Sequence, residues 1–243
     1  MFEVALGWLG SSVVGKLVER AFKRPSVRVA VNEDWESFGM SIRPRVFFVP
    51  VAHPDELTTL VDRGGVTSYS KPYRWLRENK GLDVANTSFQ FTLHAHNGTV
   101  DVLGVIPRVK ALTDERQGLA LVPPPIGGPL EVRHLLVNLD AGTWEHRNLG
   151  AEVTTSDLEN PTKPATLLVA SIPSGETEMF HVEGFTTTHS VKWWLDLKLR
   201  VNGKAVEKSV KRDDGKPFIT LRRDDPAITA KYEFRDGQWI DRD

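Results

Sequence analysis

The segment 191–201 constrains the fold more than any other part of this chain of 243 residues. Its apolar residues Val191, Trp193, Leu195, Leu197, Leu199 and Val201 alternate with Lys192, Trp194, Asp196, Lys198 and Arg200. Because successive side chains of a strand point to opposite faces, this pattern predicts a strand with one face in a core and one polar face. The following Asn202-Gly203 predicts a two-residue hairpin turn into a partner strand over 204–210.

The same period of two recurs along the chain, over 27–31, 45–51, 88–97, 99–112 and 132–139. Asn97-Gly98 predicts a hairpin between 88–97 and 99–112, and Asp236-Gly237 predicts a last hairpin near the end. Turn signals about every ten residues are typical of sandwiches and barrels. The turn 172–176 and the strand after it are similar to the edge of bacterial immunoglobulin-like sandwiches. We therefore expect a mainly β fold, an immunoglobulin-like or jelly-roll type antiparallel β-sandwich.

Two regions depart from this pattern. Residues 1–25 predict an N-terminal amphipathic helix that Pro25 ends, with a ridge of small residues at Gly7, Ser11 and Gly15 beside Trp8. A helical insertion is expected over 53–82, within a β-sandwich domain that spans 26–243. The proline-rich stretch inside 113–164 leaves an alternative open, in which two β subdomains are split there.

Composition excludes several classes of function. Lys and Arg total 31 against 32 Asp and Glu, a net charge of -1, which disfavours nucleic acid as a partner. The chain has no cysteine, which rules out disulfides and thiol catalysis and fits a cytoplasmic protein. The uncharged run 4–15 is too short to span a membrane, although peripheral membrane contact stays open. No cofactor is predicted.

Catalytic motifs are mostly absent: the chain has no GxSxG, no GxxxxGK[ST], no GxGxxG after a strand and no HExxH. The exception is His94-Ala95-His96 with Asp101, because histidines at i and i+2 on a strand share a face and can share a metal ion. This pair resembles the cupin pattern, which implies that His134 completes the set, although Asp101 stands where that pattern has Glu. The alternative is two histidines on the polar face of a strand.

Two places have the composition of binding surfaces. The predicted insertion carries Tyr69, Tyr73, Arg74, Trp75 and Arg77, aromatic and cationic residues that serve either ligand binding or packing on the sandwich. Trp194 lies on the polar face of its strand. It is either a sugar-stacking platform, as in carbohydrate-binding modules, or a docking point for the insertion or the N-terminal helix. The acidic pairs at 213–214 and 224–225 are expected to form turns.

The sequence favours a non-catalytic protein for binding and assembly, without excluding an enzyme. It would self-associate or dock through the helix of Gly7, Trp8, Ser11 and Gly15, and would recognise a partner protein through its loops or insertion. One alternative is a membrane-acting effector whose N-terminal helices associate between copies. The other is a metal-dependent, cupin-like enzyme built on His94 and His96.

Overall fold

The structure, a computed structural model, describes residues 26–33, 46–50, 80–113, 116–122, 133–148, 170–235 and 238–242. The predicted N-terminal helix lies outside these residues, with its assembly residues Gly7, Trp8, Ser11 and Gly15. So do all but the last three residues of the predicted insertion, including Tyr69, Tyr73, Arg74, Trp75 and Arg77. Both remain predictions, as does the division of the chain into domains.

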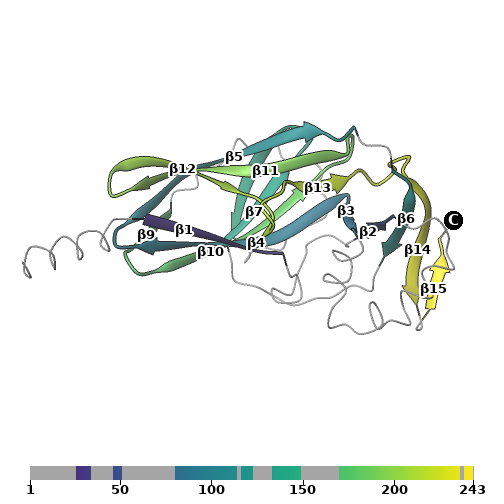
Figure 1. The fold of residues 1–243 in the computed structure, drawn as a ribbon, viewed down its shortest axis with the longest axis horizontal. Coiled ribbons are helices and arrows are strands. Elements are labelled where there is room, and N and C mark those ends of the chain that lie inside the picture. The colour runs from purple at the N-terminus through teal and green to yellow at the C-terminus, as the bar shows by residue number, and fades with distance from the viewer. Residues whose placement is uncertain are drawn as a thin grey trace, which may run out of the picture.

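All of the regular structure in the described residues is β, arranged in two sheets (Figure 1). The five-stranded sheet, here sheet A, has the order β1 (Ser26–Asn32), β4 (Asn86–His96), β10 (Thr177–Phe185), β7 (Arg133–Asn138) and β8 (Thr143–Asn148). The ten-stranded sheet, here sheet B, has the order β15 (Gln238–Asp241), β14 (Ile228–Arg235), β6 (Gly118–Val122), β2 (Val46–Val49), β3 (Leu82–Val84), β13 (Phe218–Leu221), β11 (Val191–Val201), β5 (Val100–Ala111) and β9 (Ala170–Ile172), while β12 (Lys204–Val210) also pairs with β11.

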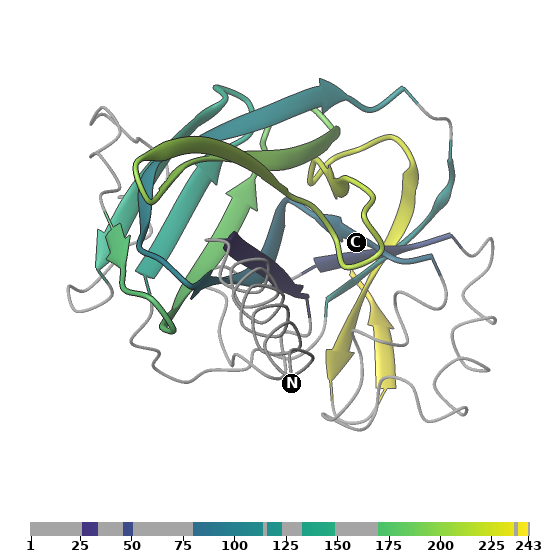
Figure 2. The same ribbon diagram turned by 60° about the vertical axis from the view of Figure 1, so that its left-hand side comes forward.

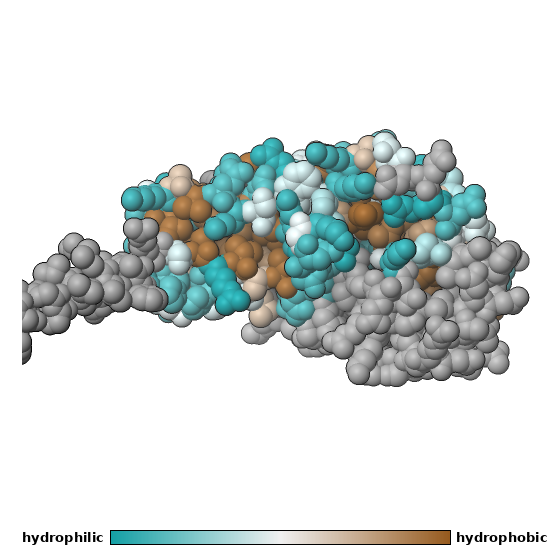
Figure 3. Space-filling view, viewed as in Figure 1, coloured by the Kyte–Doolittle hydropathy of each residue, from teal (hydrophilic) through white to brown (hydrophobic). Residues whose placement is uncertain are grey.

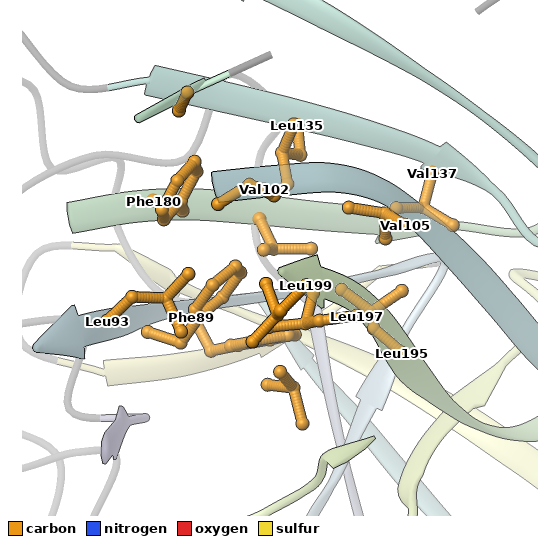
Figure 4. Packing of buried hydrophobic residues seen from close by; sticks show 14 of the residues in the cluster. Phe89, Leu93, Val102, Val105, Leu135, Val137, Phe180, Leu195, Leu197 and Leu199 are labelled. Carbon is orange, nitrogen blue, oxygen red and sulfur yellow. The ribbon is translucent and has the colours of Figure 1, made fainter. Parts of the chain in front are cut away.

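One hydrophobic core joins the two sheets (Figure 4). Sheet A contributes Phe89, Leu93 and Phe180, and sheet B contributes Leu195 and Leu197, all fully buried. The predicted inward faces of β4 and β11 are thereby confirmed. Burying each of these side chains stabilises the fold by about 1.5–3 kcal/mol, so this core holds the sandwich together.

Sheet B continues beyond the sandwich through β2, β6, β14 and β15, which Figures 1 and 2 place at the end away from β1 and β9. These strands have their own small cluster, in which Phe47, Leu119 and Tyr232 are buried. On the face that Figure 3 shows, hydrophobic residues gather between hydrophilic ones over the described part of the molecule. Met179 and Ile240 are the exposed large hydrophobic residues of the described part, and because they lie singly on different strands they mark no site.

The prediction of a wholly antiparallel sandwich is wrong, because three strand pairs of the described residues are parallel. The pairs β7–β10, β3–β13 and β6–β14 are parallel. The reason is that the chain repeatedly crosses between the sheets, so strands far apart in sequence become neighbours in the same direction. The coarse prediction of a mainly β, two-sheet fold is confirmed, while the immunoglobulin-like or jelly-roll type stays a prediction.

The prediction of a hairpin at Asn97-Gly98 is wrong, because the two strands that this turn joins do not pair. Asn97 does adopt the left-handed conformation that such a turn needs, with φ 57°. The next strand, β5, however pairs with β11 and β9 in sheet B and not with β4. A Cβ on Gly98 would lie 2.5 Å from the end of the Asn202 side chain, which would have to shift to make room for it. The turn therefore carries the chain from one sheet to the other.

Other turn predictions hold. Asn202-Gly203 joins β11 to β12 as an antiparallel hairpin, and β14 pairs with β15 in the same way. The acidic pairs form turns as expected: the Asp214 carboxylate accepts from the Lys216 N–H at 3.0 Å, and the Asp225 carboxylate accepts from the Ala227 N–H at 2.9 Å. No helix in the described residues has the length and apolarity required to cross a membrane.

Candidate functional site

The residues of the predicted metal site are divided between the two sheets. His94 and His96 lie on β4 with ring centroids 5.9 Å apart, and His94 Nδ1 shares a hydrogen bond of 2.9 Å with Thr177 Oγ1. Asp101 lies on β5 in sheet B, where it accepts a hydrogen bond of 2.9 Å from Ser171 Oγ. His134 pairs with His181, four residues along β10 from Thr177, so it lies roughly 13 Å from His94 along the strand direction.

Trp194 lies on the outward face of β11 and is half-buried, as its alternation with the buried Trp193 predicts. Two lysine side chains reach its ring from either side of β11. The Nζ atom of Lys110, on β5, lies 5.5 Å from the ring centroid, and that of Lys211, just after β12, lies 5.6 Å from it. Both distances allow cation–π attraction.

Asp196, two residues along the same face, holds this arrangement in place. Its carboxylate accepts from Arg108 Nε at 2.7 Å, Ser209 Oγ at 2.7 Å and Trp194 Nε1 at 3.2 Å. Burial acts to raise the pKa of Asp196, but the hydrogen bonds and charge of Arg108 and the bonds from Ser209 and Trp194 outweigh it, so the pKa is lowered. The anionic carboxylate therefore fixes the indole and the guanidinium together.

The surface around the indole is positively charged. We call it the Trp194 surface; it consists of Trp194, Asp196, Arg108, Lys110, Lys192 and Lys211. Within the part of the chain that the structure describes, this surface holds four cations and one carboxylate, and Lys192 lies directly opposite Lys110 in the register of β11 and β5. Because ammonium groups lie over the ring, the arrangement suits an acidic ligand better than a neutral sugar.

A second polar group lies on the outward face of sheet A and was missed by the sequence reasoning. His134 on β7 and His181 and Glu183 on β10 are buried, and their potential ligand atoms lie within 4.8 Å of one another. The cupin resemblance had assigned His134 to the His94 pair instead. The available signal was His181-Val182-Glu183, two metal-binding residue types at i and i+2 on one strand face.

No family model, no curated protein and no solved structure matches this chain. Its function must therefore be inferred from the geometry of its own residues.

Proposed function

We propose that this protein is a β-sandwich binding protein that captures an acidic segment of a partner protein on its Trp194 surface. The observation that carries the proposal is the placement of the Lys110 and Lys211 ammonium groups 5.5 Å and 5.6 Å from the Trp194 ring centroid. Tryptophan and arginine are the residue types that most often dominate binding energy at protein interfaces. Trp194 and Arg108 supply both residue types here, and the neighbouring lysines offer positive charge to the carboxylates of a ligand.

The Trp194 surface is prepared for binding before a ligand arrives. Asp196 orients both Trp194 and Arg108 through hydrogen bonds, so little side-chain freedom remains to be lost on binding. Arg108 is partly exposed beyond this bond, with 45% of its side chain accessible. A carboxylate ligand can therefore bind the guanidinium edge that Asp196 leaves open.

The extent of the charge favours a protein segment over nucleic acid. Nucleic-acid binding depends on many phosphate contacts, whereas this surface gathers four cations in a chain of net charge -1. A short acidic peptide with one apolar or aromatic residue matches both the local cations and the indole.

Binding of a fluorescein-labelled deca-glutamate peptide, followed by fluorescence anisotropy, tests the proposal. We expect Trp194→Ala to weaken binding about tenfold, and the double change Lys110→Glu with Lys211→Glu to weaken it further. A matched control makes the same charge change at Lys204 and Lys208, which are exposed on β12 and lie off the Trp194 surface. This control should bind within about twofold of the wild type.

Two results would overturn the proposal. One is wild-type protein that does not bind the peptide at low salt. The other is Trp194→Ala protein that binds it as tightly as the wild type. A labelled single-stranded oligonucleotide of equal charge serves as the rival probe, and tighter binding of that probe would contradict the choice of a protein ligand.

A further inference from the structure

His134, His181 and Glu183 are brought together by the parallel pairing of β7 with β10. His134 lies directly opposite His181 in the register, and the two ring centroids are 4.8 Å apart. Glu183 is two residues after His181, so both side chains project from the same face of β10. The pairing thus gathers three metal-binding side chains from positions 47 residues apart in the chain.

The group is buried as well as close. His134 and Glu183 are 0% exposed and His181 is 3% exposed. His134 Nε2 lies 4.0 Å from Glu183 Oε2, which is beyond the length of a direct hydrogen bond. A divalent cation placed between the carboxylate and the two imidazoles would contact all three side chains at once.

The ligand types and the spacing suit a particular class of metal. Two imidazoles with one carboxylate form a known ligand set for Zn²⁺. Around a tetrahedral ion with bonds near 2.0–2.1 Å, neighbouring ligand atoms lie about 3.4 Å apart. The three ligand atoms here lie within 4.8 Å of one another, so side-chain rotations that close the widest separation by about 1.4 Å would supply three of the four tetrahedral ligands, with a water molecule as the fourth.

Asn86 supports the carboxylate from the neighbouring strand β4. Its Nδ2 donates to Glu183 Oε1 at 3.3 Å, while the other oxygen, Oε2, is the one nearer to His134. A hydrogen bond to one oxygen that leaves the other directed at the ion is the usual arrangement behind a metal-bound carboxylate.

We propose that His134, His181 and Glu183 bind one divalent transition-metal ion of the zinc class, which ties β7 to β10. Because the three side chains are buried, a substrate cannot reach the ion, and its role is structural. This site is independent of the Trp194 surface, which lies on the other sheet. It also differs from the predicted site at His94 and His96, which lie at the opposite end of β4 from Asn86.

The test uses the full chain, stripped of metal by a chelator and then titrated with Zn²⁺ and, separately, Co²⁺. We expect one ion per chain, a rise in the melting temperature with Zn²⁺, and the visible absorption of tetrahedral Co²⁺. Glu183→Gln should weaken Zn²⁺ binding at least tenfold. The matched control is the double variant His94→Ala with His96→Ala, which should bind like the wild type.

Paramagnetic Co²⁺ locates the ion without any substitution, so the test does not depend on the folding of Glu183→Gln. The imidazole signals of His134 and His181 should shift or broaden strongly in the NMR spectrum of the wild type, while those of His94 and His96, which lie farther from the ion, should change much less. Wild-type protein that binds no stoichiometric metal would overturn the proposal, and so would Co²⁺ effects confined to His94 and His96. Either result would leave His134, His181 and Glu183 as a buried polar group without an ion.

Discussion

Gly184 on β10 lies directly against the indole of Trp193 on β11. A Cβ atom on Gly184 would be 2.3 Å from Cζ2 and 2.5 Å from Cη2 of that ring. Trp193 is fully buried and packs at tilted angles against Phe89 and Phe218, with ring centroids 5.9 Å and 5.1 Å away, so the ring has no room to move away. The contact joins the two sheets at the centre of the core.

Gly184→Ala should therefore be strongly destabilising. Overpacking a core costs about 1–3 kcal/mol, and a rigid ring at this distance places the change at the upper end, about 3 kcal/mol. Urea unfolding followed by circular dichroism measures the loss. Gly104→Ala on β5 is the matched control, because no atom lies within 4 Å of the position of its Cβ. Equal stability of the two variants would contradict the close packing at Gly184.

Thr220 on β13 binds the indole N–H of the same Trp193. Its hydroxyl oxygen accepts from Trp193 Nε1 at 2.9 Å and shares a hydrogen bond of 2.6 Å with Thr87 Oγ1, and all three residues are buried. Thr220→Val keeps the shape but leaves the indole N–H and the Thr87 hydroxyl without this partner. We expect a loss of about 1–3 kcal/mol in the free energy of unfolding. The same substitution at the exposed Thr143 should change it by less than about 0.5 kcal/mol.

Asp140, in the turn between β7 and β8, fastens the loop between β10 and β11. Its carboxylate accepts from the hydroxyls of Thr186, Thr187 and Thr188 at 2.7, 2.9 and 2.7 Å, and from the Thr187 N–H at 2.7 Å. Burial acts to raise the pKa of Asp140, but these hydrogen bonds outweigh it and hold the pKa well below its usual range. The folded state therefore prefers the ionised carboxylate.

Because the folded pKa of Asp140 is depressed, its contribution is complete above the unfolded pKa, about 3.9, and is lost as the pH falls from there toward the folded pKa. Asp140→Asn should cost about 2 kcal/mol at pH 7, and this difference from the wild type should shrink below about pH 4. Urea unfolding across this pH range checks it. Asp224→Asn, whose carboxylate is 75% exposed, serves as the control. A difference that does not change with pH would count against the hydrogen-bonded carboxylate.

The faces of β4 and β11 could be predicted from the sequence because alternation reports directly on which side chains enter a core. The same alternation does not distinguish a solvated polar face from a buried one. Ser88 and Gln90, on the polar face of β4, are 4% and 5% exposed, although their pattern is that of a solvated face. The alternation in the sequence shows which face of a strand is polar, whereas the burial of that face depends on which other parts of the chain pack against it.

The partners of strands could not be predicted from local signals. Asn97-Gly98 specifies the backbone angles of a turn, but the sheet that the next strand joins is decided by long-range pairing with β11 and β9. The same limit hid the group of His134, His181 and Glu183, because a parallel pair formed over 47 residues leaves no fixed spacing to search for. The position of Trp194 on the outward face could be predicted because its evidence, an aromatic residue in the polar set of an alternating strand, is local to β11.

The most direct test of the Trp194 surface is the indole Nε1–H spectrum of the ¹⁵N-labelled full chain during titration with deca-glutamate. Trp193 and Trp194 are neighbours on opposite faces of β11, so one is the internal control for the other. We predict that the Trp194 signal shifts in proportion to bound peptide, because its indole N–H contacts Asp196 within the charged surface, while the Trp193 signal stays in place. A peptide that binds without moving the Trp194 signal would contradict the proposed recognition surface.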